Sequence, residues 1–377
     1  MNAEDLLTRE EGKTLEFKRD ASSPAGILRT LVAFANTSGG ILVVGVEDRT
    51  RKVRGVSSPL DVEEKLANII SDGIHPLLSP DISVLPWRKT HLVAVEVYPS
   101  SLRPHRVRKE GQDHGIYVRV GSTNRRADGV IVADMTRQVR NESFDEQPMP
   151  TLSSEAINFR AASELFRERR ALKRGDLLTL RLTAKHQRTI VPTVAGILLF
   201  GKDRQAHFPD AWIQVGRFRG ADRSKILDTV SLRSLPVKAI DESIAFIRKH
   251  VSVESRIEGI RRNDLWPIPL PAIREAVINA VVHADYSQSG APIRISVFDD
   301  RIEIENPGLL PFGLTIEDIR QGISKLRNRA IGRVFHELGL IEQWGSGIQR
   351  IVSTCRDAGL KQPAFEEIGV HFRVRLY

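Results

Sequence analysis

Three carboxylates near the start of the chain, with one lysine beside them, have the types and spacing of a metal-assisted hydrolytic site. Glu11, Glu16 and Lys18 lie in EGKTLEFK, and Asp48 ends GGILVVGVED. Hard cations such as Mg²⁺ take carboxylate oxygens as ligands. A metal held there would polarise a phosphodiester and activate water, and the lysine would stabilise charge on the phosphate. The opposing interpretation is that these are solvated acids, as most charged residues are.

The elements expected around these acids would bring them together. Glu16 lies in a short strand, and Asp48 follows an apolar strand that begins with two glycines. Neighbouring strands of one sheet would therefore place the acids at an exposed edge.

A run of cations from Arg103 to Arg126 is the second feature of the first third. Two strands joined by GQDHG (111–115) are expected to form a hairpin, because Gly and Asp adopt turn conformations. The following GSTNRR loop offers donors to phosphate oxygens. This pattern favours single-stranded or shape-based nucleic-acid recognition, although an ordinary turn has the same composition. The residues expected to touch nucleic acid are Arg106, Arg108, Lys109, Arg119, Ser122, Asn124 and Arg125.

Another constellation lies in the last third, where apolar periodicity predicts a helix over residues 271–286. Glu275 and Asn279 are four residues apart, so they share one helix face and can point into a common pocket. Further on, Gly345 and Gly347 precede a predicted helix whose exposed amides suit a phosphate. Glycines at a helix start also serve plain backbone geometry, which is the alternative.

The positive charge of the chain is concentrated in its middle. Lys plus Arg against Asp plus Glu number 21 and 21 in residues 1–150, 19 and 10 in 151–250, and 16 and 16 in 251–377. The densest part is 167–188. Cationic stretches bind phosphate backbones without sequence preference. A solvated helix face is the alternative interpretation.

Composition narrows the class of protein. None of the apolar runs in the 377 residues approaches the ~20 residues of a membrane span. The acidic, polar start is unlike a signal peptide. The single cysteine, Cys355, excludes an internal disulfide and a cysteine-based zinc site. We therefore expect a cytoplasmic protein.

Prolines and turn-forming residues divide the chain, and we predict an α+β protein in three parts: residues 1–140, a linker and basic helical segment over 141–190, and residues 191–377. A helix is expected over 236–250. Strands are expected to continue to residue 377, so we expect no DNA-reading winged helix after them.

The segments EGKTLEFKRD, FANTSGGILVVGVEDRT and YVRVGSTNRRA together resemble the Schlafen-type AlbA-like domain, over roughly residues 8–140. The resemblance implies nucleic-acid binding. In nuclease members it implies Mg²⁺ or Mn²⁺ held by Glu11, Glu16 and Asp48. Schlafen nucleases pair two such lobes into a clamp, so this chain, with one lobe, is expected to form at least a homodimer.

The region from about residue 190 to 377 resembles the GHKL ATP-binding fold, in the divergent form found at the C-terminus of RecG-like proteins. The resemblance implies that Glu275 and Asn279 belong to the N-box helix and that Asn279 binds Mg²⁺. Glu275 could orient an attacking water as general base in a slow ATPase, although slow or absent turnover fits equally well. The motif His-x-Asp-Tyr at 283–286 is typical of this branch, although His283 and Asp285 could simply cap the helix. The sequence contains no Walker A motif.

The adenine-reading box of that fold departs from its usual pattern here. The usual aspartate is replaced by Asn306, followed two residues later by Gly308. An amide oxygen can still accept a hydrogen bond from an exocyclic amine, but it carries no charge. The resemblance as a whole still implies ATP or another nucleotide as cofactor, with Gly345 and Gly347 near its phosphates.

Three hypotheses follow. The first is a nucleic-acid-binding protein, such as a transcriptional regulator or a defence or stress factor, controlled by nucleotide in the C-terminal domain. The second is a metal-dependent endonuclease that acts on tRNA-like or single-stranded substrates. The third is an interaction scaffold in which both sites are relics.

Overall fold

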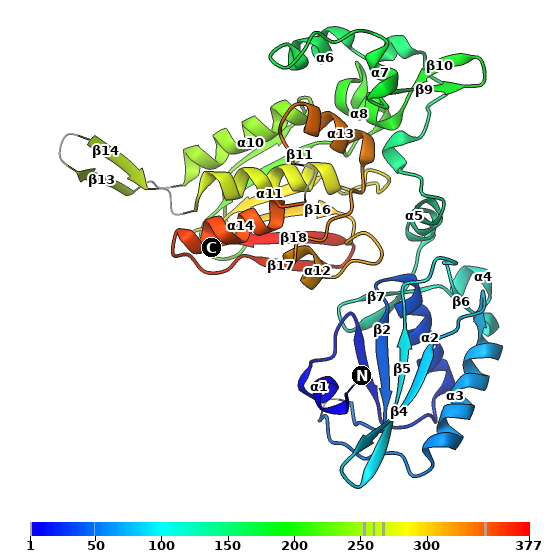
Figure 1. Ribbon diagram of the computed structural model, residues 1–377. Helices are drawn as coiled ribbons and strands as arrows, with labels where there is room; N and C mark the ends of the chain where they lie inside the picture. Colours follow the sequence, from blue (N-terminus) through cyan, green and yellow to red (C-terminus); the bar gives the residue numbers. More distant parts are fainter. Residues whose placement is uncertain (1, 49, 252–253, 259–260, 266–267, 343–344) are drawn as a thin grey trace. The chain divides into compact units, whose positions relative to one another are not determined.

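The computed structural model describes residues 2–48, 50–251, 254–258, 261–265, 268–342 and 345–377. The chain divides into two compact units (Figure 1). Unit 1 contains Met1–Asn141 and Phe312–Thr315, and unit 2 contains Glu142–Pro311 and Ile316–Tyr377. Each unit has a sheet and an apolar core of its own.

Unit 1 is built on a mixed four-stranded sheet with the strand order β1-β2-β5-β4. β1 (Leu15–Lys18) is parallel to β2 (Gly40–Val44), whereas β5 (Thr90–Val97) is antiparallel to both β2 and β4 (Asp81–Trp87). A parallel pair needs a crossover connection, and helix α2 (Pro24–Asn36) supplies it.

Both faces of this sheet are covered. On one face, α2 and α3 (Pro59–Gly73) pack an apolar core that includes Leu31, Phe34 and Leu66. On the other face, α1 (Ala3–Thr8) packs against Phe17 and its neighbours. The smaller elements of unit 1 are β3 (Ile74–His75), β6 (Arg106–Val107), η1 (Arg108–Glu110), α4 (Gly111–His114), β7 (Tyr117–Val120), β8 (Thr123–Arg126) and α5 (Gly129–Val139).

The hairpin expected around residues 111–115 is wrong. That segment forms the short helix α4, and β6 pairs with β3 instead of β7. The hairpin of this region is β7–β8, in which Val120 pairs with Thr123 across a turn at Gly121, whose φ is +56°. Four of the six residues in the GSTNRR loop, which was expected to offer phosphate donors, therefore lie in strand β8.

Unit 2 contains a six-stranded sheet with the order β12-β11-β15-β16-β18-β17. Its strands are β11 (Ile213–Phe218), β12 (Ile226–Leu232), β15 (Ile293–Val297), β16 (Ile302–Pro307), β17 (Ala364–Ile368) and β18 (His371–Leu376). β11 and β15 are parallel, and the other neighbours are antiparallel.

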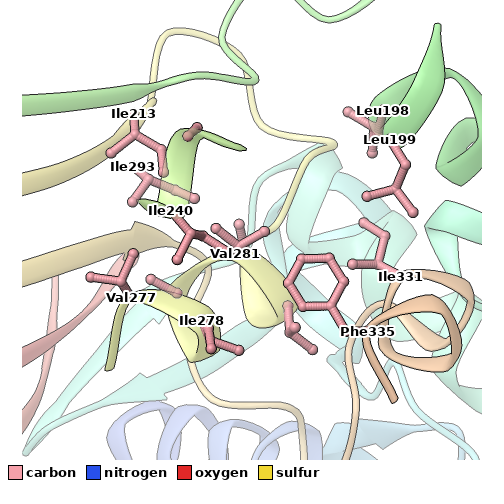
Figure 2. Close-up of a cluster of buried hydrophobic side chains, with 14 of the residues drawn as sticks. Leu198, Leu199, Ile213, Ile240, Val277, Ile278, Val281, Ile293, Ile331 and Phe335 are labelled. Atoms are coloured by element: carbon pink, nitrogen blue, oxygen red, sulfur yellow. The ribbon is translucent and has the colours of Figure 1, made fainter. Parts of the chain in front are cut away.

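Helices α10 (Pro236–His250) and α11 (Leu270–His283) pack on the sheet, and α14 (Gly347–Asp357) packs against α11. Figure 2 shows how Ile240 of α10 and Val277 and Val281 of α11 meet Ile213 and Ile293 of the sheet. α11 is buried on most of its surface, so its polar side chains are enclosed with it. Other helices are α9 (Arg204–His207), α12 (Ile316–Arg320) and α13 (Arg329–Glu337), and a separate hairpin is formed by β13 (Glu254–Glu258) and β14 (Arg261–Leu265).

Residues 142–200 belong to unit 2. They form η2 (Phe144–Glu146), η3 (Ser154–Ala156), α6 (Phe159–Phe166), α7 (Asp176–Thr179), β9 (Thr183–His186), β10 (Thr189–Pro192) and α8 (Val194–Phe200). The prediction of a basic helical segment is wrong in its last part, because residues 183–192 form the hairpin β9–β10.

The α+β fold class is confirmed, with helices and mixed sheets in both units. The helix expected over 236–250 has those bounds as α10. The helix expected over 271–286 is α11, which ends at His283. Among the described residues, none of the helices is long and apolar enough to span a bilayer.

Candidate functional sites

Glu16 of unit 1 is held between two cations. β1 lies beside β2 with Glu16 opposite Leu42, and the alternating burial of β1 turns Leu15 and Phe17 to the apolar side. The Glu16 carboxylate accepts from Lys18 Nζ through Oε1 and from Arg119 Nη2 at 2.5 Å through Oε2. Its charge is therefore already compensated inside the protein.

Arg119 was predicted to contact nucleic acid, and the structure corrects this prediction. Its side chain is 1% exposed, so it cannot reach a phosphate backbone as it lies. Nε donates to Gly12 O at 3.0 Å and Nη1 to Asn124 Oδ1 at 2.8 Å, and the guanidinium lies 5.3 Å from the centroid of the Phe34 ring. Arg119 positions Glu16 and the β7–β8 hairpin.

Asn124 is drawn into the same arrangement. Its amide accepts from Arg119 and donates to Thr30 Oγ1 at 2.9 Å. The other predicted nucleic-acid residues are at or near the surface: Arg108, Lys109, Ser122 and Arg125 are exposed, and Arg106 is half-buried.

Glu11 lies close enough to Asp48 and Glu16 to interact with both. Glu11 Oε1 accepts from the Phe17 N–H at 2.7 Å. Burial raises the pKa of Glu11, and a hydrogen bond with Asp48 together with repulsion from Glu16 and Asp48 raises it further, while the Phe17 N–H opposes the shift. Glu11 therefore interacts with both of the other predicted acids.

The oxygen ligands suit a hard divalent cation, but their arrangement does not yet fit one. Over the ranges that the structure describes, no group of three His, Cys, Asp or Glu side chains is placed to hold a metal ion. Both Glu16 oxygens accept from cations. A metal would have to displace Lys18 or share Glu16 with Arg119, so we derive no catalytic step through it.

In unit 2, two helices bring the predicted nucleotide residues together. Gly347 begins α14 directly against α11. A Cβ at Gly347 would overlap Glu275 Oε1 and lie 3.1 Å from Asn279 Nδ2. Gly347 has no positive φ in this structure, so the space is what requires glycine. Gly345, with φ +66°, packs against Ser324.

Glu275 is buried with only partial compensation of its charge. Burial raises its pKa, Arg350 lowers it, Glu342 raises it, and a hydrogen bond from Asn279 lowers it. Arg350 Nη1 lies 3.5 Å from Glu275 Oε2, and its Nη2 pairs with Glu342. A cation beside Glu275 would therefore offset part of the cost of burying its charge.

Arg350 was missed by the sequence reasoning. It follows Gly347 by three residues on α14, so the two share a helix face. From this spacing, the sequence could have predicted a cation beside the predicted pocket.

Asn306 and Gly308 lie at the end of β16. Asn306 is buried, and its Nδ2 donates to Pro307 O at 3.0 Å. Gly308 has φ +99°, and a Cβ there would meet Asp285 Cβ at 2.9 Å. Asp285 N donates to Pro307 O at 2.8 Å, which joins the end of α11 to the end of β16.

The hydrogen bonds of the His-x-Asp-Tyr motif hold neighbouring parts of the chain in place. Asp285 accepts from Ser287 N at 3.1 Å and from Gln288 Nε2 at 3.0 Å, and Tyr286 Oη donates to Val281 O at 2.9 Å. Burial lowers the pKa of His283 to about 4. A second buried amide, Asn328, donates to Val282 O and Ala284 O and so caps the C-terminus of α11.

Comparison with known families agrees with the two predicted domains. Residues 11–128 match the family model described as "Schlafen, AlbA_2", which covers the acidic residues and the β7–β8 hairpin. Residues 290–376 match the model described as "Putative ATP-dependent DNA helicase recG C-terminal". The chain therefore joins these two domains in one polypeptide, which confirms the resemblances and marks a nucleic-acid-related protein. The second match begins after α11, so it does not include Glu275 or Asn279.

One similar solved structure supports the fold, and the fold alone. The DIP2311 protein from Corynebacterium diphtheriae is similar over 99% of this chain and 78% of its own, with 22% identity and a TM-score of 0.52. The N-terminal domain of a Putative ATP-dependent DNA Helicase RecG-related Protein from Nitrosomonas europaea matches 34% of this chain and 94% of its own, with 23% identity and a TM-score of 0.26. No curated protein matches the chain.

Proposed function

We propose that this chain is a nucleic-acid-binding protein, of the kind that regulates transcription or responds to stress, in which a nucleotide bound by unit 2 changes the affinity for nucleic acid. The observation that carries the proposal is the start of α14, where Gly347 lies against Glu275 and Asn279. Free amides at a helix start bind phosphate. A Mg²⁺ ion between Asn279 and the phosphates would relieve the charge of the buried Glu275.

Nucleic acid would bind to the exposed donors of unit 1. Arg108, Lys109, Ser122 and Arg125 are at its surface, and cations and hydroxyls are the usual donors to phosphate oxygens. Arg119 and Asn124 would support this surface from beneath. The proposal includes a homodimer, because a Schlafen-type clamp pairs two lobes and this chain carries one.

The first experiment measures binding of a fluorescent ATP analogue with and without Mg²⁺. Gly347→Ala should weaken binding at least tenfold, because its methyl group would displace Glu275 and Asn279. Gly129→Ala is the matched control: Gly129 also begins a helix, α5, and a Cβ there meets nothing within 4 Å. Equal affinities in wild type and both variants would reject the site.

The second experiment tests the coupling. Affinity for labelled single-stranded and duplex nucleic acid is measured with and without saturating Mg²⁺–nucleotide, and by linkage the same factor must appear in nucleotide affinity. Coupling free energies of 1–3 kcal/mol correspond to changes of roughly 5- to 150-fold. Identical nucleic-acid affinity in both states would remove the regulatory part of the proposal.

A second candidate, a metal-dependent endonuclease, is favoured by the interaction of Glu11 with Asp48 and Glu16. Its test is incubation of labelled tRNA and single-stranded DNA with Mn²⁺ or Mg²⁺, against EDTA and a Glu11→Gln variant. Metal-dependent cutting that Glu11→Gln lacks would support this activity. Binding without cutting would leave the regulator as the function.

A further inference from the structure

The hairpin β9–β10 is a basic ribbon that the nucleotide site does not use. Thr189 pairs with His186 across the two-residue turn Gln187–Arg188, and Ile190 pairs with Lys185. Figure 1 shows the hairpin beside α7 and α8. Lys185, Gln187, Arg188, Thr189 and Ile190 are all exposed, as is Arg181 just before the hairpin.

The charge of this hairpin is uncompensated. Residues 177–202 contain no Asp or Glu. Within the described part of the chain, Arg181, Lys185 and Arg188 make no ion pair. The neighbouring cations differ, because Arg170 pairs with Glu337 and Asp176, and Arg174 pairs with Glu155.

The base of the hairpin is held firmly. Leu182 and Val191 are buried, and Thr193 Oγ1 donates to Arg181 O at 2.7 Å while accepting from Gly196 N at the start of α8. Thr193 N also donates to Leu182 O at 3.0 Å. The cations are thus presented on a fixed ribbon that spends little conformational entropy on binding.

The hairpin turn carries a side chain where glycine is favoured. Gln187 has φ +51° at the first turn position, a conformation that disfavours residues with a Cβ. Strained backbone of this kind clusters at functional positions. Here it places polar and cationic side chains, instead of glycine, at the outermost point.

We propose that β9–β10 contacts the sugar-phosphate backbone of duplex DNA and inserts its tip toward the major groove. The major groove of B-DNA admits a two-stranded ribbon, whereas the deep, narrow major groove of A-form RNA does not. Residues 167–199 contain no Phe, Tyr or Trp, so the ribbon lacks the stacking surface that single strands need. The inference rests on the proposed nucleic-acid function and names a second contact surface, in unit 2.

The test is fluorescence anisotropy of the full chain with a labelled mixed-sequence DNA duplex across a salt series. Lys185→Gln combined with Arg188→Gln should weaken duplex binding about tenfold. It should also lower the slope of log K against log salt by about 1.8, since each lost phosphate contact removes about 0.9. The matched control is Arg160→Gln combined with Lys238→Gln, which removes two exposed cations from α6 and α10.

The outcomes separate the inference from the proposed function. If wild type binds the duplex and the hairpin variant binds with equal affinity and slope, the hairpin contact is wrong and the proposed function stands. A loss confined to single-stranded DNA, or an equal loss in the control variant, also overturns it. If wild type binds no nucleic acid at all, the proposed function itself fails. Unchanged melting temperatures of both variants show that folding is intact.

Discussion

The two units hold a largely buried glutamate in opposite ways. In unit 1, Glu16 has a cation on each oxygen, and one of them, Arg119, is 1% exposed. In unit 2, Glu275 has one arginine at 3.5 Å, which it shares with Glu342. Lys18 and Arg119 compensate the charge of Glu16. The charge of Glu275 is compensated only in part, and its pKa is raised.

The difference separates structural charge pairs from sites that can accept a ligand. A metal that binds at Glu16 must compete with the guanidinium of Arg119. Because this group is buried, water would not solvate it once it lost the carboxylate. A cation binding beside Glu275 compensates a charge that burial disfavours. The comparison therefore favours unit 2 as the unit that takes a Mg²⁺–nucleotide.

Removing the two arginines gives the largest expected contrast. Arg119→Ala leaves Glu16 without its buried partner and should lower the free energy of unfolding of unit 1 by about 3–5 kcal/mol. Arg350→Ala removes a partly exposed pair and should cost less than about 1 kcal/mol. Chemical denaturation of both variants measures this, and equal losses would break the comparison.

Replacing the two glutamates should give effects of opposite sign. Glu16→Gln weakens charged hydrogen bonds and should destabilise unit 1 by about 1–3 kcal/mol. Glu275→Gln should raise the melting temperature at pH 8, because the folded state disfavours the ionised form of Glu275. A carboxyl with a raised pKa loses stability as pH rises, so this gain should disappear near pH 4. A gain that persists at pH 4 would show that charge is not its cause.

The smallest effect concerns the acids around Glu11. Because the pKa of Glu11 is raised, protons compete with a divalent cation for this carboxylate more strongly than at an ordinary glutamate, so binding should strengthen as pH increases. At ten times its Kd, Mn²⁺ should stabilise wild type by about 1.4 kcal/mol. Thermal shifts at pH 5.5 and 7.5 measure it, with Glu11→Gln as control, and a shift independent of pH would place the ion elsewhere.

The sequence predicted much of the fold because local patterns decided it. α10 and α11 follow apolar periodicity, and both have proline in the first turn. The hairpin over 111–115 failed for the opposite reason. Its composition suits a turn, but β6 pairs with β3, some thirty residues earlier in the chain, and this pairing has no local sign.

The sequence predicted which residue types form the candidate sites, but it predicted their burial and contacts less well. Glu275 and Asn279 are four apart on one helix, so their common face followed from helix geometry. Arg119 looked like one more surface cation. Its burial depends on Phe34, Gly12 and Leu15, which come from distant parts of the chain. No periodicity within a four-residue strand distinguishes an arginine that points into such a site from one that points out.

The strand order of unit 2 has a consequence for synthesis on the ribosome. β18 (His371–Leu376) lies between β16 and β17, so the strand of this sheet that comes latest in sequence occupies an interior position. The sheet of unit 1 is complete in sequence at Val97. At 5–20 residues per second, its strands are available about 14 to 55 s before β18 emerges. β16 ends at Pro307, so for about 3 to 13 s before β18 emerges β16 presents an open edge. An unpaired edge strand invites aggregation, so chains terminated in that interval should depend most on chaperones.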